Sequence, residues 1–172
     1  REAGCWTCAP AAAAWGWRWP PMCLPAGWCW GAVGRSLAGV QAERPPQQPD
    51  ARVTCVSVNA WSPRPLPCGT LTIIACNPPY IPTGDIPGLD VSVRDYEPHM
   101  ALDGGADGLD FYRAVTQKWK SALRLGGSLI FEVGIGQAPS VEDILARNGF
   151  EGIQTTADTQ GIWRVVEGTV NR

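Results

Sequence analysis

The chain has a single histidine among its 172 residues and no apolar run of roughly 18 or more residues. A lone histidine is a poor basis for imidazole chemistry, and we expect His99 to pack or hydrogen-bond in a loop. No charged segment precedes an apolar core at the amino-terminal end, so neither a membrane span nor a secretory signal is predicted. We therefore expect a cytoplasmic protein.

Excess charge is also missing. Fourteen basic residues stand against sixteen acidic ones, giving a net charge of −2 and a pI near 5.4. This balance argues against a protein that holds nucleic acid by a general basic field. The seven cysteines are odd in number, and Cys23 and Cys29 do not form a second C-x-x-C beside Cys5 and Cys8. We expect no metal, free thiols in a reducing compartment, and Cys76 as a small core residue.

The composition changes near residue 50. The first 50 residues hold six of the nine tryptophans and show no sustained helical or strand period. We interpret residues 1–50 as an atypical Trp/Ala/Pro-rich segment, either disordered or translated out of frame. Residues 51–172 have the length and patterning of part of one α/β domain.

The most informative feature is the tetrapeptide Asn77-Pro78-Pro79-Tyr80, which follows the apolar run at residues 71–76. The run is typical of a buried parallel strand, and ligands of an open α/β sheet bind beyond the carboxyl ends of such strands. The prolines fix φ and have no N–H to donate. An asparagine oxygen and a nearby carbonyl are then available to accept both protons of an –NH2 group. The tetrapeptide, here called the clamp, therefore suits a planar nitrogen nucleophile.

The clamp, extended by Ile81-Pro82 and followed by the block YEPHMALDGGADGL at residues 96–109, resembles the release factor N(5)-glutamine methyltransferases over about residues 51–168. The resemblance implies the carboxyl-terminal part of a class I methyltransferase, a Rossmann-like doubly wound sheet with an antiparallel edge strand. It also implies a monomer without metal that moves a methyl group from S-adenosylmethionine to the glutamine of a Gly-Gly-Gln motif in a peptide-chain release factor. Asn77 and Pro78 would be catalytic, all four clamp residues would bind substrate, and Asn77 and Asn59 would contact the cofactor.

Two departures from that family concern the cofactor. Asn59 and Thr72 stand where relatives usually have aspartate, and residues 1–50 contain no strand followed by a glycine-rich turn. If the codons from Cys5 onward are read two nucleotides later, the permitted codons give Leu-Asp-Leu-Cys-Thr-Gly-Ser-Gly-Cys, in which only Leu-Asp is compelled. That string is similar to the cofactor motif of the family. We therefore interpret the segment as a frameshift product, with the frame restored between Gly31 and Arg52.

Two other functions stay open at this stage. A nucleic-acid amino-group methyltransferase would use the same clamp on a flipped adenine, and an inactive fragment would bind no cofactor. The remaining pattern predicts strands at residues 52–58, 71–76, 128–133, 153–156 and 162–166, a helix over 110–125, and a helix that opens with a capping box at 140–143 and stops at Gly149. The segment 81–107 is expected to be a long loop at the active face, acting as a lid or a substrate-docking element.

Overall fold

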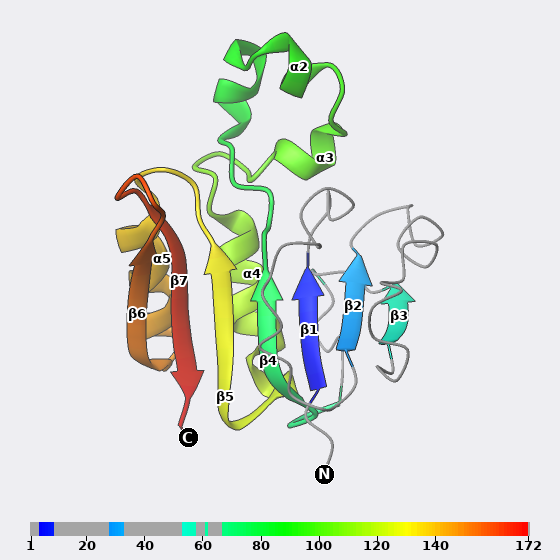
Figure 1. The fold of residues 1–172 in the computed structure, drawn as a ribbon, viewed down its shortest axis with the longest axis vertical. Helices are drawn as coiled ribbons and strands as arrows, with labels where there is room; N and C mark the ends of the chain where they lie inside the picture. The colour runs from blue at the N-terminus through cyan, green and yellow to red at the C-terminus, as the bar shows by residue number, and fades with distance from the viewer. Residues whose placement is uncertain (1–3, 9–27, 33–52, 58–60, 62–66, 172) are drawn as a thin grey trace.

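A computed structural model describes residues 4–8, 28–32, 53–57, 61 and 67–171. Its centre is a seven-stranded sheet in the order β3-β2-β1-β4-β5-β7-β6 (Figure 1). The first five strands in that order run parallel, and β7 is antiparallel to both β5 and β6. The strands are β1 (Gly4–Cys8), β2 (Trp28–Ala32), β3 (Val53–Ser57), β4 (Leu71–Cys76), β5 (Leu123–Glu132), β6 (Glu151–Ala157) and β7 (Trp163–Val170).

Strands β1 and β2 lie in the segment in which no strand period is visible. Both are five residues long and pair in parallel with each other, and β1 also pairs with β4. A parallel ladder is made by backbone groups, so it does not require the alternation of side chains by which strands are found in a sequence. The structure therefore adds two strands to the prediction.

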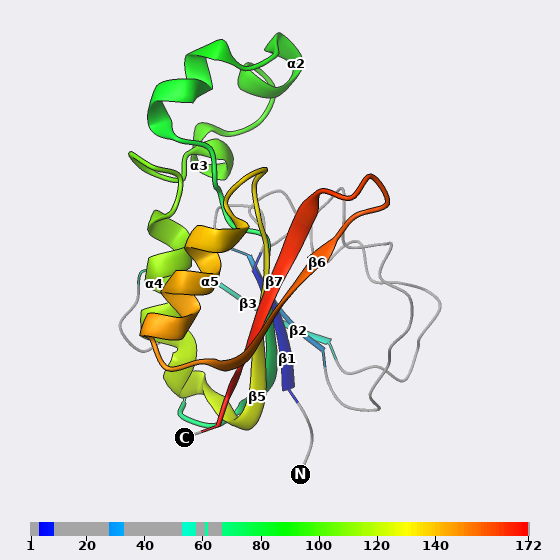
Figure 2. The same ribbon diagram turned by 90° about the vertical axis from the view of Figure 1, so that its left-hand side faces the viewer.

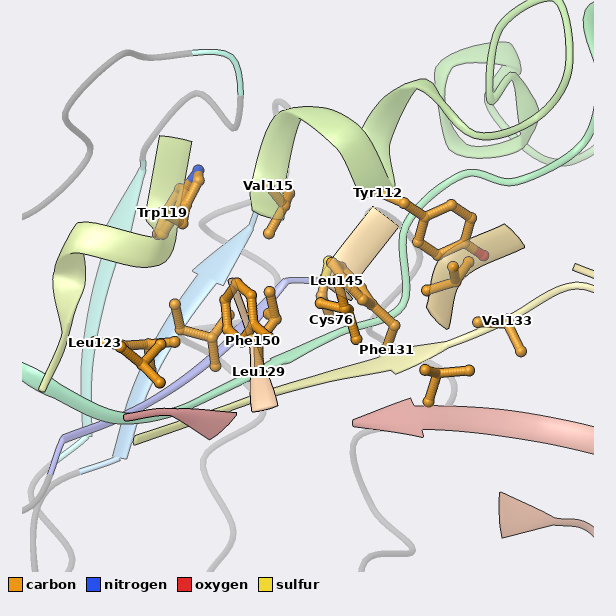
Figure 3. Close-up of a cluster of buried hydrophobic side chains, with 14 of the residues drawn as sticks. Cys76, Tyr112, Val115, Trp119, Leu123, Leu129, Phe131, Val133, Leu145 and Phe150 are labelled. Carbon is orange, nitrogen blue, oxygen red and sulfur yellow. The ribbon is translucent and has the colours of Figure 1, made fainter. Parts of the chain in front are cut away.

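Two helices, α4 (Asp110–Trp119) and α5 (Ala138–Arg147), cover one face of the sheet (Figure 2). The core lies between them and β4, β5 and β7, and its largest fully buried side chains are Trp119, Tyr112 and Phe131 (Figure 3). The Tyr112 and Phe131 rings meet edge to face with centroids 5.2 Å apart, a favourable aromatic geometry. Cys76 is buried in the same cluster, as the sequence predicted.

The predicted helix over 110–125 is too long. It ends at Trp119 and is followed by the 3-10 turn η2 (Lys120–Ala122), and β5 begins at Leu123, well before the predicted start at 128. Leu123 pairs with Leu71 of β4, and Gly126 takes a φ of +75° inside the irregular part of the β4–β5 ladder. Such a φ costs glycine nothing, so residues 126 and 127 bend a strand here instead of ending a helix.

The predicted capping box at 140–143 is also wrong. Helix α5 begins at Ala138 after Gln137, with Pro139 in its first turn, and no side chain caps it. Proline is well suited to that position because it has no N–H to satisfy. The Glu142 carboxylate instead accepts a hydrogen bond from the Thr155 hydroxyl of β6. The antiparallel edge pair β6–β7 was predicted correctly.

Segment 81–107 is less irregular than expected. It contains the 3-10 helix η1 (Thr83–Gly88) and two single-turn helices, α2 (Val91–Arg94) and α3 (His99–Leu102). We call residues 83–102 the arm. The arm extends beyond the carboxyl ends of the strands in both views (Figures 1 and 2).

Candidate active site

The clamp lies at the point where the sheet changes direction. From β1 the chain builds the sheet one way through β2 and β3, and it then returns to place β4 on the other side of β1. Cys76, the last residue of β4, is level with Cys8 of β1 and Phe131 of β5. The residues that follow therefore emerge at the topological switch point, where doubly wound sheets bind their ligands.

Within the clamp, Pro78 and Pro79 are buried, whereas Asn77 and Tyr80 are partly exposed. In the described part of the chain, neither the Asn77 side chain nor the Pro78 carbonyl has a hydrogen-bond partner. Both groups are partly shielded by the fold and retain their capacity to accept hydrogen bonds. This arrangement suits a ligand that brings two N–H groups.

Three glycines form a cradle around Tyr80. A Cβ atom added to Gly104 would lie 2.8 Å from the Tyr80 Cα, one added to Gly134 would lie 2.9 Å from the Tyr80 Cδ2, and one added to Gly108 would overlap the Tyr80 carbonyl oxygen. Gly108 also has a φ of +73°. The GG..G spacing of the block thus serves close backbone approach to the clamp as well as turning.

Gln137 connects this cradle. Its Nε2 donates to the Tyr80 carbonyl at 2.9 Å and to the Gly108 carbonyl at 3.4 Å. Its Oε1 accepts from the Gly134 amide at 3.1 Å and lies 3.3 Å from the Tyr112 hydroxyl, which is also 3.2 Å from the Glu132 carbonyl. The sequence placed Gln137 at the active edge with ordinary loop hydrogen bonding. It gave no sign of the tie to Tyr80 or of the Tyr112 hydroxyl, which belongs to a helix face predicted only to pack.

The arm is joined to the clamp by a hydrogen-bonded neck. Ile81 N donates to the Leu102 carbonyl at 3.0 Å, Gly104 N to the Ile81 carbonyl at 2.8 Å, and Thr83 N to the Gly105 carbonyl at 2.9 Å. The Thr83 hydroxyl adds a 2.7 Å hydrogen bond to the Asp103 carboxylate, and this bond is the main cause of the lowered pKa of Asp103. The hydrogen bonds of the neck thus hold the base of the arm in a fixed position next to the clamp.

Burial raises the pKa of the Tyr80 hydroxyl, and the negative charges of Glu132 and Glu97 raise it further while Arg164 opposes them. Partial loss of hydration also raises the pKa of Glu132, again against the charge of Arg164. The Arg164 guanidinium in turn lies 3.5 Å from the Asp158 carboxylate. Tyr80 is therefore held as a neutral hydroxyl at ordinary pH, able to pack against a planar group.

Of the other candidates, only His99 belongs to the residues that the structure describes, and it is not brought to the clamp. Asn59 and the residues that follow β1 lie outside the described residues. His99 is exposed on the arm, 3.8 Å from Asp103. Among the described residues there is no group of three side chains suited to hold a metal ion. No helix of that part is long and apolar enough to cross a membrane.

Sequence comparison finds relatives of this chain. A release factor glutamine methyltransferase of Geobacter sulfurreducens is 44% identical over 129 residues, which make up 75% of this chain and 45% of that protein. Another, of Clostridium acetobutylicum, is 47% identical over 94 residues, or 55% of this chain and 33% of that protein. The chain is related to the release factor glutamine methyltransferases. It spans less than half the length of these two relatives.

Structural comparison finds a solved structure with the same fold. The crystal structure of a methyltransferase from Pyrococcus furiosus superposes with a TM-score of 0.68, covering 99% of this chain and 76% of that chain at 12% identity. At that identity the likeness concerns the fold alone: the sheet and its helices have the fold of that methyltransferase. No protein-family model matches the chain. The predicted family resemblance and fold class are confirmed.

Proposed function

We propose that the site transfers a methyl group from S-adenosylmethionine to the side-chain amide nitrogen of a glutamine, in the Gly-Gly-Gln motif of a peptide-chain release factor in the cytoplasm. The observation that carries the proposal is the pair of free acceptors, the Asn77 side chain and the Pro78 carbonyl, at the switch point of the sheet. The names of the relatives support methyl transfer and a release-factor glutamine as the acceptor.

An amide nitrogen is a poor nucleophile because its lone pair is delocalised into the carbonyl group. In the proposed reaction Asn77 Oδ1 and the Pro78 carbonyl accept its two hydrogens and orient the nitrogen. Both oxygens also stabilise the positive charge that develops on the nitrogen. Pro79 and the neutral Tyr80 ring pack against the planar amide. The nitrogen forms its new bond to the methyl carbon as the carbon–sulfur bond breaks, and one amide proton is then lost to water.

S-adenosylmethionine, when bound, supplies the methyl group as an electrophile on sulfur. Asn77 is the described residue expected to lie beside it, and its free polar side chain fits that position. Asn59 is proposed as the second contact. We also propose that residues 1–50 derive from a shifted frame, so that the chain with its frame restored is the form that binds cofactor fully.

The charge of the arm favours a protein acceptor over a nucleic acid. The arm carries four carboxylates, at Asp85, Asp90, Asp95 and Glu97, and one arginine, Arg94. All five side chains are exposed, and Arg94 is already engaged with Asp95 at 2.7 Å. Phosphate groups approaching the clamp past this surface would be repelled.

The test measures binding of S-adenosylmethionine by calorimetry and then transfer of labelled methyl to a Gly-Gly-Gln peptide. The frame-restored chain is assayed beside the 172-residue chain, with the codons of residues 1–50 resequenced. Asn77→Ala should lower kcat by roughly 100-fold or more, because one preorganised acceptor is lost. A Gly-Gly-Glu peptide, which lacks the amide, and an adenine-containing oligonucleotide are the control acceptors. Transfer to the oligonucleotide, or equal rates for both peptides, would refute the proposal.

A further inference from the structure

We propose that Gln137 is a positioning residue that fixes the distal end of the clamp, at Tyr80. The expected effect on kcat rests on the proposed function, whereas the expected effect on the position of Tyr80 does not. The proximal end of the clamp is fixed by the β4 ladder, through Cys76. Beyond it Pro78 and Pro79 allow little variation in φ. The orientation of Asn77 then depends on where the chain is held at Tyr80.

The Gln137 amide is used to its full capacity. A glutamine side chain has two donors and two acceptor positions. Here the donors face the Tyr80 and Gly108 carbonyls, and the oxygen faces the Gly134 amide and the Tyr112 hydroxyl. Rotating the amide by 180° would place its oxygen against two carbonyls, so the partners fix its orientation. The side chain cannot shift without breaking several bonds at once.

The position of Gln137 in the chain makes this assignment specific. It is the residue before α5, yet its side chain does not cap that helix. It instead reaches a carbonyl 57 residues away in sequence, three residues beyond Asn77. The bonds are partly buried, where a lost partner leaves an unsatisfied carbonyl at a cost of about 1–3 kcal/mol. Gln137 does not reach the acceptor oxygens of Asn77 and Pro78, so its effect on the reaction is indirect.

A general stabilising role and a positioning role predict different results. The Tyr80 ring lies against Gly134, so a nuclear Overhauser effect between the Tyr80 ring protons and the Gly134 α-protons reports the position of the clamp. The variant is Gln137→Met in the full 172-residue chain, which keeps the length of the side chain and removes its hydrogen bonds. The control is Val170→Ala. Val170 is buried in β7, where it pairs with Gly127 of β5, at the end of the ladder that lies away from Glu132. Gln137→Glu, which keeps the shape and loses both donors, serves if the methionine variant does not fold.

We expect the Tyr80–Gly134 effect to be lost in the Gln137 variant and kept in the Val170 variant at a matched margin below each melting temperature. In the methyl-transfer assay, made with the same substitution in the frame-restored chain, kcat should fall about 10- to 100-fold with little change in KM for S-adenosylmethionine. If the effect is kept in the Gln137 variant, or lost equally in both, Gln137 does not position the clamp. If the frame-restored chain without the Gln137 substitution transfers no methyl group, the proposed function fails while the Tyr80–Gly134 result still decides the role of Gln137.

Discussion

Replacing Gly108 by alanine should displace the clamp, and the structure offers a matched substitution that isolates the cause. Gly108 and Gly69 have almost the same φ, +73° and +69°. Placing alanine in this left-handed region costs about 1–2 kcal/mol at either position. At Gly69 a new Cβ has nothing within 4 Å, whereas at Gly108 it would overlap the Tyr80 carbonyl oxygen and lie 2.7 Å from Gln137 Nε2.

The difference between the two variants therefore measures the clash with the clamp. An extra methyl group in a tightly packed site costs typically about 1–3 kcal/mol. A destabilisation near 2 kcal/mol lowers the melting temperature of a domain of this size by roughly 4–8 °C. We expect Gly108→Ala to melt lower than Gly69→Ala by that amount in a thermal unfolding experiment followed by circular dichroism. Equal melting temperatures would refute the argument that Gly108 is needed for close approach to Tyr80.

Burial and ionisation give the remaining predictions. In β5, the Leu129 side chain is 0% exposed and the Leu125 side chain is 71% exposed. Leu129→Ala should therefore lower the free energy of unfolding by about 2–5 kcal/mol, while Leu125→Ala should change it by less than about 0.5 kcal/mol. Similar losses for the two variants in denaturant titrations would contradict the assigned core. Burial raises the pKa of Tyr112, so the folded state binds its proton more tightly than the unfolded state does, and stability falls as the pH rises above the ordinary tyrosine value of about 10. Tyr112→Phe should flatten this alkaline fall and cost about 1 kcal/mol at neutral pH, and an unchanged pH profile in the variant would show that Tyr112 does not cause it.

Local signals account for what could be predicted from the sequence. The apolar run of β4 and the two prolines after it define a strand and a turn from adjacent residues alone. Strands β6 and β7 were predicted from their own patterns, and their antiparallel pairing from the family resemblance. In contrast, the boundary between α4 and β5 was misplaced because Leu123 continues the apolar period of the helix, and only its pairing with Leu71 shows that it belongs to the sheet.

The missed parts of the site are long-range. The bond from Gln137 to Tyr80 joins residues 57 apart, and nothing in the local sequence of either residue requires the other. The same is true of Gly134, whose lack of a side chain makes room for the Tyr80 ring. From the sequence, such glycines are interpreted as turn formers. A glycine that turns the chain and a glycine that makes room for a neighbouring side chain cannot be told apart in the sequence.

The three blocks at residues 77–80, 104–108 and 134–137 are therefore one structural unit, although the sequence presents them separately. The ladder of β4 holds one end of the clamp, and Gln137 together with the three glycines around Tyr80 holds the other. The exposed ion pairs nearby, such as Arg113 with Asp107, contribute little to this order because solvent screens them. The geometry of the two acceptors on Asn77 and Pro78 is thus set by backbone contacts and one partly buried amide. A change in any of the three blocks should reach the acceptors, whereas a change in the surface charges should leave them in place.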